Sequence, residues 1–251
     1  MDSMQRLLGL MRKAIQEFDM LQDGDVIGVG VSGGKDSVAL LQGLCLLRRF
    51  AGVEYEVKAI TLDLGFHGQQ TDYTPIRELC DRLGVEYAIQ RTQIGEIVFD
   101  TLRENNPCAL CARMRRGALH DKAKELGCNK IALGHHYDDA VETFVMNLFQ
   151  GGRIACFAPV TYLSIKDITM IRPLVFAEER DVAAAVRKAG LPVVKNPCPV
   201  DGATEREWTK QFLKQLEVTH PGVTYKLFGA MRRGDVDGWG YTGKGGRHRI
   251  G

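Results

Sequence analysis

The sequence lacks an apolar run of about 18 residues, the length that a membrane-spanning helix requires. Its N-terminus also lacks the hydrophobic segment of an export signal, so we expect a cytoplasmic protein with no membrane partner. The net charge is only +2, so any surface that binds nucleic acid must be a local patch. Seven cysteines are an odd number, which argues against a disulfide framework and favours metal binding or core thiols.

The 251 residues are 45% hydrophobic and 25% charged, which is ordinary for a soluble globular protein with a sizeable core. Apolar segments with strand and helix patterns alternate along the chain, which predicts an α/β fold with a doubly wound, mostly parallel sheet and C-terminal helices. Strands are expected at 25–31, 55–62, 85–89 and 130–133, with 160–165 and 168–171 as a hairpin or two edge strands. Helices are expected at 1–21, 38–49, 75–83, 112–126, 139–149, 178–188, 205–216 and 223–233.

Three parts are expected along the chain. Residues 1–24 form an N-terminal helix, and residues 25–217 form the main domain, which contains an inserted segment with a cysteine pair. Residues 218–251 contain a C-terminal helix and a flexible basic tail, which we expect to begin at Gly234 because glycines are frequent from there.

A glycine-rich turn, residues 32–37 (Ser-Gly-Gly-Lys-Asp-Ser), joins the first predicted strand to a helix. Free N–H groups and the helix dipole make such a turn an anion site, to which Lys35 adds a cation. A Walker A loop is excluded, since Val29 replaces its first glycine and Asp36 follows the lysine. A dinucleotide fingerprint matches at its glycines, but the acidic residue expected at the end of the second strand comes too late, at Asp63.

The same turn resembles the Ser-Gly-Gly-x-Asp-Ser pyrophosphate loop of the PP-loop ATPases. Those enzymes cleave ATP between the α- and β-phosphates and adenylate a substrate. The resemblance therefore implies that residues 32–37 hold the phosphates of ATP.

Three of the cysteines are expected on loops that proline marks. Cys108 and Cys111 form a C-x-x-C pair after Pro107, and Cys198 lies between two prolines. Three thiolates suit a [4Fe–4S] cluster with one open iron, but a C-x-x-C pair alone also permits zinc or a redox dithiol. The remaining four are expected to be core residues: Cys45, Cys80, Cys128 and Cys156.

Residues 134–139 (Gly-His-His-Tyr-Asp-Asp) follow a predicted strand, so we expect them at the same sheet edge as residues 32–37. Carboxylates there are suited to hold Mg²⁺ or to act as acid and base. Asp138 is expected to cap the following helix, and the two histidines are expected to be ordinary loop residues. A basic run beside the C-x-x-C pair predicts either a solvated face or a patch for RNA phosphates: Arg113, Arg115 and Arg116.

Together these stretches resemble the tRNA 2-thiocytidine synthetase family of PP-loop ATPases, from about residue 20 to about residue 215. Cys198 falls where that family has its third cysteine, although the surrounding Pro-Cys-Pro-Val differs from the Asn-Leu-Cys-Gly pattern of its cytidine enzymes. The other matching pieces are residues 32–37, 107–117, 134–139, 142–143, 151–153, 172–174 and 179–181.

The resemblance implies a PP-loop (adenine nucleotide alpha hydrolase-like) fold and ATP, Mg²⁺ and a [4Fe–4S] cluster as cofactors. It also implies a reaction in two steps, in which ATP adenylates a carbonyl oxygen of tRNA and sulfide, held on the open iron, then attacks the carbon of that carbonyl. Asp139 corresponds to the catalytic acid, Arg115 to a basic catalytic residue, and the catalytic thiols are Cys108 and Cys198, which with Cys111 bind the cluster. The expected ATP-binding residues are Gly30, Ser32, Gly33, Gly34, Lys35, Asp36, Ser37, Asp63 and Gly134.

The expected partners are tRNA, a sulfur donor (a cysteine desulfurase or free sulfide) and a second copy of the chain. Two other functions remain open at this point. One is a PP-loop ligase or amidotransferase that acts on a small molecule, which would not need sulfide. The other is an ATP-binding Fe–S sensor without catalytic activity, which would form no AMP.

Overall fold

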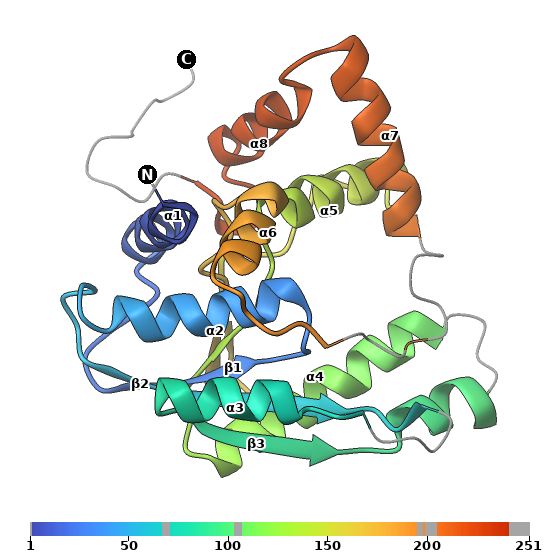
Figure 1. The fold of residues 1–251 in the computed structure, drawn as a ribbon. Coiled ribbons are helices and arrows are strands. Elements are labelled where there is room, and N and C mark those ends of the chain that lie inside the picture. The colour runs from blue at the N-terminus through green and yellow to red at the C-terminus, as the bar shows by residue number, and fades with distance from the viewer. Residues whose placement is uncertain (1, 67–70, 103–106, 195–197, 199–204, 241–251) are drawn as a thin grey trace.

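A six-stranded sheet with the order β3-β2-β1-β4-β6-β5 runs through the molecule (Figure 1). The computed structural model describes the chain except residues 1, 67–70, 103–106, 195–197, 199–204 and 241–251. The strands are β1 Asp25–Gly30, β2 Tyr55–Asp63, β3 Glu86–Arg91, β4 Lys130–Ala132, β5 Val160–Leu163 and β6 Ile168–Ile171. The helices are α1 Ser3–Glu17, α2 Lys35–Leu47, α3 Thr74–Leu83, α4 Pro107–Glu125, α5 Tyr137–Phe149, α6 Glu179–Lys188, α7 Glu205–Thr219 and α8 Val223–Arg233, with a π-helix η2 at Glu96–Thr101 and a 3₁₀ turn η3 at Val236–Gly238.

The sheet is parallel except at one edge. β1 lies between β2 and β4, and the register aligns Ile27 with Val57 on one side and with Lys130 on the other. Only β5 runs antiparallel, because it forms a hairpin with β6. The strand order reverses beside β1, so the carboxyl ends of β1 and β4 border the crevice where α/β sheets bind ligands.

Side chains that alternate along the strands pack into two hydrophobic cores, one on each face of the sheet. Ile27, Val29 and Val57 belong to the large core that they share with α1, α2, α5 and α6. Ile60 and Ile131 belong to a smaller core on the opposite face, which α4 covers. Helices therefore cover both faces, and the predicted doubly wound, mostly parallel sheet is confirmed. In the described part of the chain, no helix has both the length and the apolar character needed to cross a membrane.

The C-terminal segment contributes to the large core. Trp239 is fully buried, its ring contacts Phe18, Phe157 and Phe228, and its Nε1 donates to the carbonyl of Phe157 at 2.6 Å. The prediction of a flexible tail from Gly234 is therefore wrong for residues 234–240, because burial of one large ring fixes them. Residues 241–251, the rest of the predicted tail, lie outside the described residues.

Candidate active site

The phosphate loop joins β1 to α2. The helix begins at Lys35, three residues earlier than predicted, so Lys35, Asp36 and Ser37 form its first turn. Ser37 Oγ accepts from the N–H of Ser32 at 3.2 Å and donates to the carbonyl of Gly34 at 2.9 Å, which closes the turn on itself. Gly33 has φ +88°, and a Cβ there would lie 2.9 Å from Val194 Cβ, so only glycine fits.

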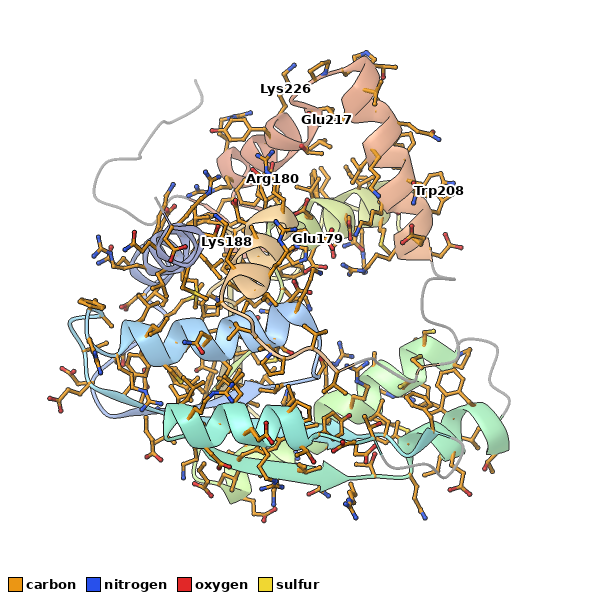
Figure 2. The ribbon with its side chains drawn as sticks, in the orientation of Figure 1. Glu179, Arg180, Lys188, Trp208, Glu217 and Lys226 are labelled. Atoms are coloured by element: carbon orange, nitrogen blue, oxygen red, sulfur yellow. The ribbon has the colours of Figure 1, made fainter. Side chains whose placement is uncertain are left out.

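Lys35 is held by carboxylates. Its Nζ lies 3.1 Å from Asp36 Oδ2 and 3.0 Å from Oε1 of Glu179, the first residue of α6 (Figure 2). Burial lowers the pKa of Lys35, but Asp36 and Glu179 together raise it above its usual value. Glu179 also accepts from Lys210 of α7 at 2.7 Å, and its bonds to Lys210 and Lys35 lower its pKa to about 2, against its partial burial. Lys35 is thus a fixed cation at the N-terminus of α2.

The loop after β4 packs against the phosphate loop. A Cβ on Gly134 would lie 3.1 Å from the backbone carbon of Asp36 and 3.2 Å from the nitrogen of Ser37, so glycine allows this close approach. His136 is the N-cap of α5, and its Nδ1 accepts from the N–H of Asp139 at 3.4 Å. The prediction that Asp138 caps this helix is wrong, because the helix starts at Tyr137 and places Asp138 in its first turn.

Asp139 lies in an ion-pair group that the sequence did not reveal. Its Oδ2 accepts from the backbone N–H of His136 at 2.9 Å, and its Oδ1 lies 2.8 Å from Nη1 of Arg206 on α7. The same Nη1 lies 3.4 Å from Oε2 of Glu142. Burial raises the pKa of Glu142 to about 7, although Arg206 opposes the rise.

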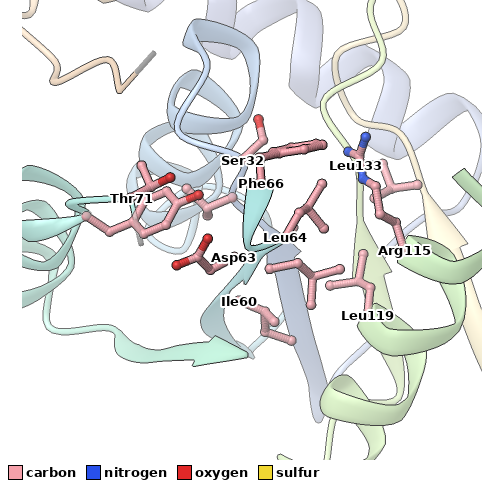
Figure 3. Close-up of a pocket in the computed structure, with 13 residues that line it drawn as sticks. Ser32, Ile60, Asp63, Leu64, Phe66, Thr71, Arg115, Leu119 and Leu133 are labelled. Atoms are coloured by element: carbon pink, nitrogen blue, oxygen red, sulfur yellow. The ribbon is translucent and has the colours of Figure 1, made fainter. Parts of the chain in front are cut away.

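A cavity of about 120 Å³ opens beside the phosphate loop at the ends of β1 and β2 (Figure 3). Apolar and polar groups both line it, with Ser32 and Asp63 on the sheet side and Arg115 with Leu119 on the α4 side. Asp63 is only 4% exposed, so its carboxylate is a nearly buried polar group of this cavity. A nucleoside has this mixture of apolar faces and hydrogen-bonding edges.

Cys108 lies in the first turn of α4 and Cys111 at the start of the second, because the helix begins at Pro107. The prediction that this pair lies on a loop is therefore wrong, and proline is favoured in a first helical turn since its missing N–H is not needed there. Cys108 is exposed, Cys111 is buried and Cys198 is half-buried. Residues 195–197 and 199–204, the predicted proline-flanked loop around Cys198, lie outside the described residues.

Cys111 lies close enough to the other two thiols for them to affect its pKa. Burial raises the pKa of Cys111, Arg115 one helical turn later lowers it, and Cys198 and Cys108 raise it further. Among the described residues, no three side chains of His, Cys, Asp or Glu converge as ligands of a single metal ion do. In a [4Fe–4S] cluster each thiolate binds a different iron, so its ligands need not converge on one point. The donor set of three neighbouring thiols beside a cation fits such a cluster.

The other cysteines differ from these three. Burial raises the pKa of Cys80 to about 12, of Cys128 to about 11 and of Cys156 to about 12, which keeps these thiols protonated. Burial also raises the pKa of Cys45, which accepts from Arg48 at 3.4 Å. All four therefore have the environment of core thiols.

Most of the predicted site residues lie along the carboxyl edge of the sheet. The phosphate loop, Gly134 and Asp139 adjoin one another, and Asp63 shares the cavity with Gly30 and Arg115. Arg113, Arg115 and Arg116 are exposed on α4. Sequence reasoning missed four charged residues that hold this site: Glu142, Glu179, Arg206 and Lys210. Two signals were present: Glu142 and Glu179 lie in stretches that match the family, and Arg206 and Lys210 are four residues apart on one helix face.

Residues 6–217 match the family described as PP-loop domain. The chain is 42% identical over 224 residues to a tRNA-cytidine(32) 2-sulfurtransferase of Syntrophotalea carbinolica, covering 87% of this chain and 85% of the relative. It is 40% identical over 222 residues to the protein of that name from Geobacter sulfurreducens, covering 87% and 86%. Among solved structures it is similar to the U34-tRNA thiolase NcsA from Methanococcus maripaludis with its [4Fe–4S] cluster, with TM-score 0.73 and 25% identity over 90% of this chain and 77% of that one.

Proposed function

Because the chain belongs to the PP-loop domain family and to the tRNA-cytidine 2-sulfurtransferases, we propose that it is an ATP-dependent enzyme that thiolates a cytidine in tRNA. The observation that carries the proposal is the shared position of two sites. The phosphate loop and the cavity with Arg115 lie at one edge of the sheet, and Arg115 also neighbours the cysteine group. A carbonyl oxygen leaves only after activation, so adenylation and sulfur transfer need adjoining sites.

ATP supplies the activation in this proposal. Its phosphates bind residues 32–37, where Lys35 and the N-terminus of α2 stabilise the charge of the departing pyrophosphate. Its nucleoside part extends toward the cavity that Asp63 lines. The cytidine oxygen attacks the α-phosphorus, so pyrophosphate leaves and AMP becomes the second leaving group.

Mg²⁺ fits beside Asp36. The Oδ1 atom of Asp36 is buried, and no described residue donates a hydrogen bond to it. His136 Nε2 lies 3.9 Å from this oxygen. A buried carboxylate oxygen without a donor is suited to a hard cation, which would neutralise the phosphate charge.

Cys108, Cys111 and Cys198 are the residues that would hold a [4Fe–4S] cluster. When bound, the cluster supplies an iron without a cysteine ligand, which is a site for sulfide. Arg115 provides positive charge beside the thiolates, and Cys111 is buried against Ile94 and Val98, which excludes water on one side. Asp139 is the proposed catalytic acidic residue, held at the start of α5 with both of its oxygens accepting hydrogen bonds.

The test is an anaerobic reaction of the reconstituted protein with ATP, Mg²⁺, sulfide and tRNA. We expect AMP formation that depends on tRNA and 2-thiocytidine in the digested tRNA, both measured by mass spectrometry. AMP formed without RNA would indicate a small-molecule ligase. No AMP with any tRNA would indicate an ATP-binding sensor.

The same experiment separates the sulfur donors and the partners. Product formation with sulfide alone would show that free sulfide is a sufficient sulfur donor. A requirement for cysteine and a cysteine desulfurase would show that the desulfurase is the donor. Affinity for tRNA should fall with salt, with a log–log slope of about −0.9 for each duplex phosphate contacted. Charge reversal at Arg113 and Arg116 should reduce that slope, and light scattering checks the proposed homodimer.

A further inference from the structure

α7 brings two cations to the site from a part of the chain that follows Cys198. Arg206 and Lys210 lie one turn apart on this helix. Lys210 binds Glu179, which holds Lys35 of the phosphate loop. Arg206 instead reaches α5, where one guanidinium contacts three side chains: Asp139 at 2.8 Å, Glu142 at 3.4 Å and Thr143 at 3.2 Å.

We propose that Arg206 is a positioning residue for Asp139, an inference that rests on the proposed function. The backbone N–H of His136 fixes Oδ2 of Asp139 at 2.9 Å, and Arg206 fixes Oδ1 at 2.8 Å. A carboxylate held at both oxygens from different elements cannot rotate about its own axis. Arg206 therefore sets the direction in which Asp139 faces the reacting nucleoside.

The charge balance requires a cation at this place. Asp139 lies one turn before Glu142 on α5, and Glu142 has an almost buried side chain, 8% exposed. The charged groups that act on Glu142 are Arg206 and Lys210 from α7 and Asp138 and Asp139 from α5. Without Arg206 the carboxylates would face one another with Lys210 as the remaining cation, and like charges at such spacing repel.

Arg206 is also not a core residue. Its side chain is 41% exposed, so replacement leaves no buried cavity, and the cost to stability is confined to the lost ion pairs with Asp139 and Glu142. An effect of Arg206 on the reaction can therefore be separated from an effect on folding.

The experiment compares Arg206→Gln, Arg206→Lys and Glu207→Gln in the reconstituted holoenzyme. Glu207 is a partly buried residue of the same helix that accepts a hydrogen bond from Gln211, one turn further along α7. We expect Arg206→Gln to lower kcat for AMP formation about 100-fold, the effect of a misplaced catalytic group, with KM for ATP unchanged. Lysine keeps the charge, so Arg206→Lys should recover part of kcat, and Glu207→Gln should match the wild type.

A pH profile gives a readout that a structural role would not move. Arg206 lowers the pKa of Glu142 more than Lys210 does, so its removal leaves Lys210 alone to oppose the effect of burial. The acidic limb of the kcat–pH profile should move to higher pH in Arg206→Gln and return in Arg206→Lys. An unchanged kcat and limb in Arg206→Gln, or a loss equal to that of Glu207→Gln, would overturn the inference.

Failure of the proposed function has a different signature. A wild type that forms no AMP with tRNA refutes that function whatever the variants do. The pH dependence of unfolding then decides whether Arg206 holds the carboxylates. If Arg206 holds the carboxylates, the pH dependence of unfolding must move to higher pH in Arg206→Gln. An unchanged pH dependence of unfolding refutes the inference.

Discussion

Replacing the buried carboxylate of Glu142 by an amide should change how stability depends on pH. Burial raises the pKa of Glu142 to about 7 from its ordinary 4.5, and Arg206 lowers it by less than burial raises it. Between these values the native state holds a proton that the unfolded chain has lost. The free energy of unfolding therefore falls as the pH rises through this range.

The magnitude follows from the pKa values. At 1.36 kcal/mol for each pH unit, a rise from 4.5 to about 7 costs the wild type about 3 kcal/mol by about pH 8. Glu142→Gln cannot ionise and escapes this cost. The difference in stability between variant and wild type should therefore grow by about 3 kcal/mol in favour of the variant from about pH 4 to about pH 8.

Urea unfolding at a series of pH values measures this difference, and other titrating groups cancel because both proteins share them. Glu207→Gln on α7 is the matched control, since Glu207 is only partly buried, and its replacement should give a stability difference that does not change with pH. If the stability difference between Glu142→Gln and the wild type also stayed constant with pH, Glu142 would titrate at its ordinary value. The reasoning from burial would then be refuted.

Three further predictions concern the loop, the thiols and the core. Lys35→Ala should weaken ATP binding at least tenfold in calorimetry without unfolding the chain, because it removes one charged contact to phosphate; unchanged affinity would contradict the phosphate loop. Cys111→Ala should abolish the absorbance at about 400 nm that is expected of a thiolate-bound iron–sulfur cluster, whereas Cys80→Ala should keep it. Trp239→Ala should destabilise the fold by about 3–5 kcal/mol in denaturant unfolding, since the ring is fully buried.

The sequence predicted what local patterns control. Alternating apolar segments were sufficient for the parallel sheet and for nearly all helices, and the antiparallel hairpin of β5 and β6 was one of two predicted outcomes. The family predicted from residues 32–37 and the three cysteines is confirmed by the match to the PP-loop domain together with the similar tRNA-cytidine(32) 2-sulfurtransferases. These features depend on short stretches whose chemistry is independent of distant partners.

The rest depended on contacts between distant parts of the chain. Pro107 was interpreted as a loop signal, although the same residue opens α4. Arg206 and Asp139 are 67 residues apart, and no local pattern pairs them. The glycines near the C-terminus predicted a flexible tail, but a hydrophobic slot formed by three other segments holds Trp239.

The buried ring of Trp239 has a consequence for how the protein is made. Its partners include Phe18, at the end of α1, and Phe228, on α8. A ribosome releases the first of these more than two hundred residues before the tryptophan. The apolar face at the end of α1 therefore lacks this partner during most of the synthesis of the chain. The large core closes only when the last described segment leaves the exit tunnel, so translation stalled before residue 239 yields a chain that chaperones would have to shield.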